Sequence, residues 1–290
     1  MCRLARVSRA GFYRNWQERA PAAAEVELRA AVHQVALAHR RRYGYRRILQ
    51  DLRQAGLTVG KHRLQRIMRE DNLLAIRHRK FILTTESRHD YPVYLNLAAR
   101  MTLTSINQLW VADITYIRLQ REFVYLAVVM DRYSRKAVGW AVDKTLASRL
   151  VIDALRKAIE ERRPGPGLVH HSDRGVQYAS ADYAQLLSAH GIIASMSRPA
   201  NPYDNAACES FMKTLKQEEI YCNQYRDWMD LSTHLEEFID QYYNRLRLHS
   251  ALGYKTPEDF ERSCAVPPAG QLTAAATMAF FTPPAKKAGA

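Results

Sequence analysis

The fold is decided by the stretch Leu109-Trp110-Val111-Ala112-Asp113-Ile114-Thr115-Tyr116-Ile117. It is rich in β-branched and aromatic residues, which favour strands. A continuous apolar run follows at Phe123–Met130, which predicts a strand buried on both faces, and Lys136–Val142 predicts a third strand. The three sequential strands predict an antiparallel meander at the start of this domain.

Helices and strands alternate after the meander. A helix is predicted over residues 147–162, where apolar residues repeat every four positions, and Pro164-Gly165-Pro166-Gly167 ends it. The remaining elements are predicted as a strand at 168–171, a helix at 181–190, a strand at 192–195, and helices at 204–220 and 228–245. This order predicts an α/β domain with a mixed five-stranded sheet, as in the ribonuclease H-like fold.

The first third of the chain is strongly basic. Residues 1–100 hold 21 Lys and Arg against 8 Asp and Glu, whereas the remaining residues hold 22 against 21. A basic segment joined to a nearly neutral body is typical of a module that binds a polyanion such as nucleic acid. A solvated basic surface or a solubility tail is the alternative, but such tails lack the apolar periodicity found here.

Helices in this basic segment are predicted at 22–38, 46–55 and 61–70. The expected apolar positions of the first helix are Val26, Leu28, Val32, Val35 and Leu37. The glycine-bearing turn at 56–60 separates the other two, which is typical of a helix-turn-helix, with an ordinary basic helical hairpin as the alternative. The candidate DNA contacts of this all-α region are Arg46, Arg47, Lys61, Arg63 and Arg66.

The expected organisation has four parts. A basic helical region spans 1–71, a basic linker 72–107, the α/β core 108–262, and a disordered tail 263–290. The four cysteines form no Cys-x-x-Cys pair, which argues against a zinc finger or a disulfide framework and favours a reducing cytoplasm. The apolar stretches are too short for a bilayer and Met1–Arg6 leads into no signal core, so we expect no membrane partner and no export.

Three acidic residues lie where phosphodiester chemistry could use them. Asp113 lies within the first strand, where an unpaired carboxylate is costly, and Asp173 follows the fourth strand, at the sheet edge where ligands bind. Glu209 lies one turn into the next helix. The residues that share its face at helical spacing are Asn205, Lys213 and Lys216. A carboxylate there suits a divalent metal, and the lysines suit phosphate.

Other polar residues have simpler interpretations. Asp131 is expected as a turn residue and Asp143 as a solvated strand end. For Asp113 the alternative is a structurally paired buried acid. His170 and His171 are expected to pack at the sheet end or to contact phosphate, because Mg²⁺ prefers oxygen ligands.

Three blocks of the sequence resemble the catalytic blocks of the integrase-core transposases. They are Trp110–Tyr116, His171–Tyr178 and Asn201–Phe211. Thirty-five residues separate Asp173 from Glu209, the interval for which that group is named, and Lys216 stands seven residues beyond Glu209, as in its pattern.

Two further segments carry the resemblance. Tyr43–Ile48 is similar to the family's N-terminal helix-turn-helix block and Tyr243–Tyr254 to its C-terminal signature. Residues 40–262 most closely resemble the second-frame (orfB-type) transposase of the third insertion-sequence family, with Ala112 in place of a more usual hydroxyl residue.

The resemblance implies a DDE transposase that cleaves DNA at terminal inverted repeats and transfers strands through 3′-OH attack. Phosphodiester chemistry of this kind suits two Mg²⁺ ions, for which Mn²⁺ should substitute. We expect Asp113 to bridge both ions, Asp173 to hold one and Glu209 the other. The expected DNA contacts near the cut are Lys216, Lys213, Asn205 and Arg174.

The partners expected from the resemblance are double-stranded DNA, at the element ends and at the target, and further copies of the chain on that DNA. The product of an upstream frame, with its own helix-turn-helix and leucine zipper, is a further expected partner. The expected location is the bacterial cytoplasm, on the nucleoid. Two other functions are considered: a DNA-binding regulator with a decayed core, and a Mg²⁺-dependent nuclease that only cuts.

Overall fold

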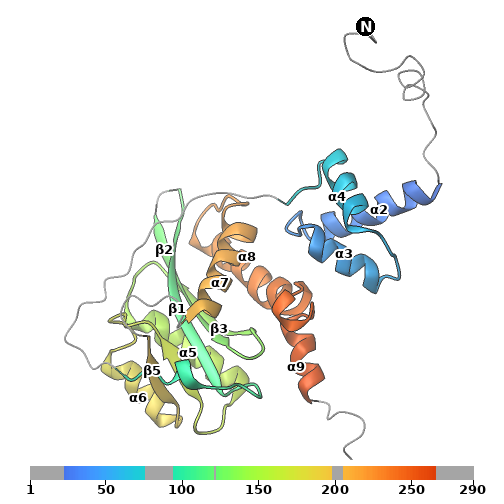
Figure 1. Cartoon of the computed structure of the whole chain (residues 1–290). Helices are drawn as coiled ribbons and strands as arrows, with labels where there is room; N and C mark the ends of the chain where they lie inside the picture. Colours follow the sequence, from blue (N-terminus) through green and yellow to red (C-terminus); the bar gives the residue numbers. More distant parts are fainter. Residues whose placement is uncertain (1–22, 76–93, 121, 198–204, 266–290) are drawn as a thin grey trace, which may run out of the picture. The chain divides into compact units, whose positions relative to one another are not determined.

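The computed structural model describes residues 23–75, 94–120, 122–197 and 205–265 (Figure 1). The chain divides into two compact units, Met1–His78 and Arg79–Ala290. Several expectations fall outside the described residues: the linker between 76 and 93, the loop 198–204 with the start of the third catalytic block, and the tail from 266. None of the described helices has the length and apolar character needed to cross a membrane.

The first unit is helical, as predicted. Its helices are α2 (Ala23–Ala38), α3 (Tyr45–Gln54) and α4 (Lys61–Glu70). The buried side chains of α2 lie four residues apart, at Leu28, Val32 and Ala36, and they form a single stripe. Val26 and Leu37 lie off this stripe and are exposed, contrary to the sequence-based expectation for them.

The second unit contains the predicted mixed sheet. Its strands are β1 (Leu109–Arg118), β2 (Phe123–Asp131), β3 (Ala137–Asp143), β4 (Val169–Ser172) and β5 (Ile193–Met196). The strand order is β3-β2-β1-β4-β5, with antiparallel pairs on the β3 side of β1 and parallel pairs on the β5 side. The antiparallel meander that feeds a parallel half is therefore confirmed, and with it the predicted α/β fold class.

Two helices pack beside this sheet. Helix α5 (Ser148–Arg162) packs against β3 and β2, and α6 (Ala181–Ala189) packs against β5 (Figure 1). The approach of α5 is very close at Gly139, where a Cβ atom would lie 2.3 Å from the Ala154 carbonyl oxygen. A side chain is therefore excluded at Gly139, and the helix backbone seats directly on the strand.

The helices after the sheet differ from uninterrupted α-helices. Helix α7 (Ala206–Leu215) continues as the π-helical segment η3 (Lys216–Ile220), and α8 (Trp228–Glu236) continues as the π-helical segment η4 (Glu237–Leu246). A short turn η5 (Ser250–Leu252) and helix α9 (Pro257–Ala265) follow. Helix α7 packs on β1. The helix was predicted from residue 204, which lies outside the described residues, and Asn205 occupies the N-cap position of α7.

Part of the segment expected as a linker lies against the core. Residues 94–107, which include the turn η1 (Ala98–Arg100), form hydrogen bonds with the core. The Leu97 amide donates to Ser195 Oγ at 2.9 Å, and the Asn107 amide donates to Asp131 Oδ2 at 2.6 Å. Asp131 also accepts from the Ser134 amide, which makes it the turn residue that was expected.

Candidate active site

The parallel register of β1 and β4 brings two of the predicted acids together. Trp110 pairs with His170 and Val111 pairs with His171. Continuing this register by two residues places Asp113 level with Asp173, the first residue after β4. Side chains alternate along a strand, so Asp113 faces away from Ala112, which packs in the cluster that α5 covers. Both carboxylates therefore lie on neighbouring strands at the same end of β4.

Asn205 ties the third acidic residue to the same strand. Its Nδ2 donates to the Ala112 carbonyl oxygen at 2.9 Å, and the residue is only 8 % exposed. This bond attaches the N-terminal end of α7 to β1 beside Asp113. Glu209 lies one helical turn further on and is exposed. The structure thus gives Asn205 a partner within the protein, whereas the sequence analysis expected it to contact DNA.

The electrostatics of Asp113 show that the three carboxylates share one neighbourhood. Burial, first, and the charges of Asp173 and Glu209 together raise the pKa of Asp113 to about 7, against the hydrogen bond from the Ile114 amide, which acts to lower it. The Lys216 ammonium also acts to lower it. An acid whose ordinary pKa lies near 4 therefore titrates near neutrality.

Lys216 lies near this acidic group, since the charge of Asp113 acts on its pKa. Its Nζ lies 5.0 Å from the centre of the Tyr116 ring, a cation–π contact. Burial lowers the pKa of Lys216, and the charge of Asp113 opposes that change. Lys213 lies three residues earlier, on the exposed face of α7. Both predicted lysines therefore lie next to the acidic residues.

The loop after β4 holds the Asp173 carboxylate through a backbone hydrogen bond. The Gly175 amide donates to Asp173 Oδ1 at 2.9 Å, and a Cβ atom at Gly175 would lie 3.0 Å from that same oxygen. Arg174, an expected DNA contact, donates from Nε to the Ser197 carbonyl oxygen at 2.9 Å. The backbone at Gly175 therefore approaches the carboxylate as closely as a residue without a side chain allows.

The two histidines of β4 pack inside the sheet. His171 contacts Ser195 Oγ at 2.9 Å and Ser197 Oγ at 3.0 Å through its two ring nitrogens, and His170 Nε2 lies 3.1 Å from the Tyr183 hydroxyl. Burial lowers the pKa of His170 to about 3, so its ring is neutral at physiological pH. Both rings are buried, which fits the packing role expected for them.

The donor atoms at this site suit a hard divalent cation. Three carboxylates supply oxygen ligands, and their mutual repulsion is what a bound cation would relieve. Within the described part of the chain, no three His, Cys, Asp or Glu side chains already lie close enough together to hold a metal ion. The oxygen donors of the three carboxylates fit a divalent cation by their chemistry. To bind one, the carboxylates would have to come closer together than they lie here.

The predicted DNA contacts of the first unit lie either against tyrosine side chains or in ion pairs with glutamates. Arg46 Nε donates to the Tyr45 hydroxyl at 3.2 Å, and Lys61 Nζ lies 5.7 Å from the centre of the same ring. Arg63 instead forms an ion pair with Glu25 of α2. The contacts of the remaining two are Arg47 over the Tyr43 ring at 5.4 Å and Arg66 to Glu70 at 3.8 Å.

Comparisons with known proteins decide the family. Two family profiles described as an integrase core domain match residues 104–202 and 190–257, and one described as an HTH-like domain matches residues 23–81. An uncharacterized 31 kDa protein of the insertion element IS600 from Shigella sonnei is 38% identical over 90% of this chain and 97% of that protein. The chain belongs to the integrase-core proteins of insertion sequences.

Two relatives that are named as transposases also have similar sequences. Transposase InsF for insertion sequence IS3A of Escherichia coli (strain K12) is 36% identical, over 90% of this chain and 92% of that protein. The transposase for IS904 of Lactococcus lactis subsp. lactis (strain IL1403) is 35% identical, over 81% of this chain and 92% of that protein. The predicted family is confirmed, and the helix-turn-helix region is part of the match.

Sequence reasoning did not single out Gly175 in this candidate site, and it did not predict the contact that Asn205 makes within the protein. Gly175 lies inside the second catalytic block, and a glycine two residues after a candidate metal ligand was a signal for close backbone approach. Asn205 was assigned to DNA because it shares a helical face with Glu209. Its position at the start of the helix is a second signal, since the side-chain amide of an N-cap residue can also bind the backbone of a neighbouring strand.

Proposed function

We propose that this transposase cleaves DNA at the terminal inverted repeats of its insertion sequence and transfers the strands by 3′-OH attack, with Asp113, Asp173 and Glu209 as its catalytic carboxylates. The observation that carries the proposal is the coupling of both other acids to Asp113, together with the register that sets Asp173 beside it. If Asp113 were an acid in a structural ion pair, a neighbouring cation would lower its pKa. The pKa is raised instead, in part by the charges of two other acids, which supports a metal site.

The carboxylates would hold Mg²⁺, with Mn²⁺ as a substitute. Two such ions bound there would supply activation of the attacking oxygen and stabilisation of the leaving 3′ oxygen. Asp113, Asp173 and Glu209 would be the protein ligands of these ions. Lys216 and Lys213 would bind the phosphates that flank the cut, and the exposed basic face of α4 would bind the duplex further along.

The partners of this reaction are proposed with it. They are double-stranded DNA of the element ends and of the target, further copies of the transposase on that DNA, and the product of an upstream frame. The reaction would take place in the bacterial cytoplasm, on nucleoid DNA. Family membership covering both the helical region and the core favours this function over a regulator with a decayed core.

A strand-joining assay tests the proposal and separates it from a nuclease that only cuts. A labelled duplex that carries one inverted repeat is incubated with the protein, Mg²⁺ and an unlabelled target plasmid. Label covalently joined to the plasmid supports a transposase. Cleaved but never joined duplex would leave a nuclease, and neither product under any metal condition would contradict the proposal.

Gly175→Ala is expected to lower the rate of strand joining about tenfold or more with little loss of stability. The added Cβ would lie 3.0 Å from Asp173 Oδ1 and displaces that carboxylate, and sub-ångström misplacement of a catalytic group is costly. Gly165→Ala is the matched control, because nothing lies within 4 Å of its Cβ position. Joining rates and melting temperatures of the two variants decide the matter: equal rates would show that Asp173 does not need this backbone approach.

Replacing Arg63 and Arg66 with Gln is expected to weaken DNA binding and to flatten its salt dependence. The plot of log K against log[salt] has a negative slope, and each lost phosphate contact reduces the magnitude of that slope by about 0.9. Arg149→Gln, on the exposed surface of α5, is the control for loss of charge. Binding is measured by fluorescence anisotropy between 50 and 200 mM salt, a range of about the width used for such slopes. Unchanged binding would show that this face of α4 does not contact DNA.

A further inference from the structure

The C-terminal signature, Tyr243–Tyr254, has no part in the chemistry proposed above, yet it contains a buried ion pair. Arg247 follows η4 directly and is only 5 % exposed. Its Nε donates to Glu218 Oε2 at 2.9 Å, and its Nη2 donates to Glu218 Oε1 at 2.7 Å. This is a bidentate pair between segments 29 residues apart. Glu218 belongs to η3, two residues after Lys216.

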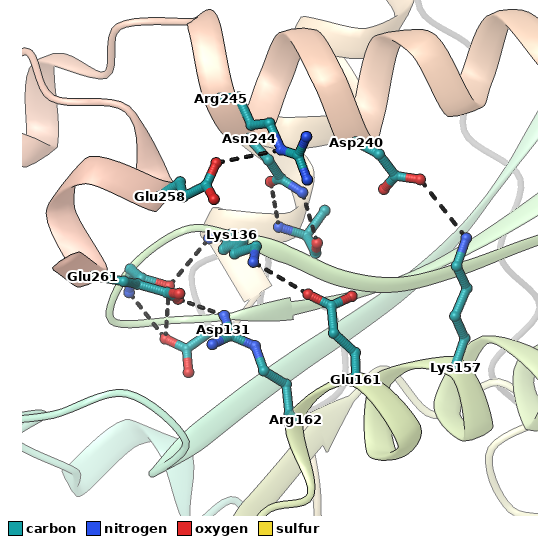
Figure 2. A network of polar contacts seen from close by, with 12 residues as sticks. Asp131, Lys136, Lys157, Glu161, Arg162, Asp240, Asn244, Arg245, Glu258 and Glu261 are labelled. Atoms are coloured by element: carbon teal, nitrogen blue, oxygen red, sulfur yellow. Dashed lines mark hydrogen bonds and ion pairs between the residues drawn. The ribbon is translucent and has the colours of Figure 1, made fainter. Parts of the chain in front are cut away.

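The same signature also contacts helix α7 and strand β3. The Tyr243 ring packs edge-on against the Phe211 ring of α7, with centroids 4.7 Å apart. Asn244 donates from Nδ2 to the Ala137 carbonyl oxygen at 2.9 Å and accepts from the Ala137 amide at 3.0 Å (Figure 2). The C-terminal signature therefore binds α7, η3 and strand β3 at the same time.

The pair acts where the helix changes its geometry. The α-helical hydrogen bonding of α7 gives way to π-helical bonding at Lys216, and π-helical turns are rare and occur frequently at functional sites. A forked contact at Glu218 restrains the direction in which this turn leaves α7. The opposite end of α7 is restrained by the bond from Asn205 to Ala112. Glu209 lies between these two attachments.

We propose that Arg247 is a positioning residue: through Glu218 it holds α7 and η3 so that Glu209 and Lys216 face Asp113. The inference rests on the proposed function in one respect, that Glu209 is a catalytic carboxylate. Arg247 itself lies in the helix contact and acts only through Glu218 and Tyr243, whose ring centre lies 5.7 Å from its guanidinium carbon.

The test removes the ion pair without leaving a buried charge. Replacing one partner alone strands the other, whereas replacing both by apolar residues of similar volume is often neutral for stability. The variant is therefore E218M/R247M. We expect a melting temperature near that of the wild type, a kcat for strand joining lower by about 10- to 100-fold, and an unchanged KM for DNA.

A matched pair from the same region serves as the control. Arg245 and Glu258 form an exposed ion pair at 3.3 Å that does not touch η3 (Figure 2). R245M/E258M is expected to keep the wild-type kcat. R247K provides a second test should the double variant not fold: it keeps the charge but not the fork, and we expect an intermediate kcat with a normal melting temperature.

A metal-free measurement separates positioning from general stability. Amide hydrogen exchange of residues 216–220 is expected to be faster in E218M/R247M, while exchange in α5 stays at the wild-type rate. Folded E218M/R247M with a wild-type kcat and unchanged exchange would overturn the inference. Activity of Glu209→Gln would instead overturn the proposed function, so the two failures are distinguishable.

Discussion

Replacing Asp113 with Asn is expected to abolish both strand cleavage and strand joining. The substitution keeps the shape of the side chain and removes the charge on which the other two acids act. A carboxylate that holds a catalytic metal lowers the activation barrier by several kcal/mol. Its removal therefore lowers the rate on the order of 10³-fold. Asp173→Asn and Glu209→Gln are expected to behave in the same way. Cleavage of an end-labelled duplex in Mg²⁺ measures all three.

DNA binding and a fourth acid provide the controls for this experiment. The three variants should bind the same duplex as tightly as the wild type, since the helix-turn-helix region belongs to the separate first unit. Asp143→Asn removes an acid at the end of β3 that accepts from the Thr145 amide at 2.9 Å, and its cleavage rate should stay at the wild-type level. Substantial Mg²⁺-dependent cleavage by any purified variant of the three would contradict the assignment.

The same Asp113→Asn substitution is expected to stabilise the metal-free protein at neutral and alkaline pH. Burial and the neighbouring acids raise the pKa of Asp113 to about 7, above its value in the unfolded chain. Between about pH 4 and pH 7 the unfolded state therefore binds fewer protons, and the wild type loses stability as the pH rises. The advantage of the Asn variant should grow through this window and remain constant above it.

The expected gain at pH 8 is about 2 kcal/mol, less than a fully buried carboxylate would give because solvent screens part of the charge. Denaturant unfolding in chelator between pH 4 and pH 9 measures it. Added Mg²⁺ should then stabilise the wild type more than the variant, since a ligand stabilises the state that binds it. A stability difference that does not change with pH would show that the pKa of Asp113 is not raised in the folded protein.

Much of the fold could be predicted because its signals are local. The apolar run at Phe123–Met130 and the four-residue repeat of α5 specify their elements through neighbouring residues, and the structure has both. The exposed side chains of Val26 and Leu37 were predicted wrongly because the width of the buried stripe of α2 depends on what packs against it. The switches to π-helix at Lys216 and Glu237 were not predicted from the sequence.

The candidate site divides along the same line. Asp113 and Asp173 could be paired from sequence, because the ends of neighbouring parallel strands meet at one sheet edge. The place of Glu209 could be inferred only by resemblance, since α7 reaches β1 through a loop whose path no local pattern specifies. The partners of Asn205 and Arg247 lie 93 and 29 residues away, and only a folded chain brings such residues together.

The hydrogen bonds of Asn244 have a consequence for solubility. Strand β3 is at one end of the sheet, and an edge strand with free amides and carbonyls can recruit a strand from another molecule. The side-chain amide of Asn244 offers Ala137 one donor and one acceptor, as an adjoining backbone would. A single side chain thereby closes that part of the border and limits aggregation through this edge of the sheet.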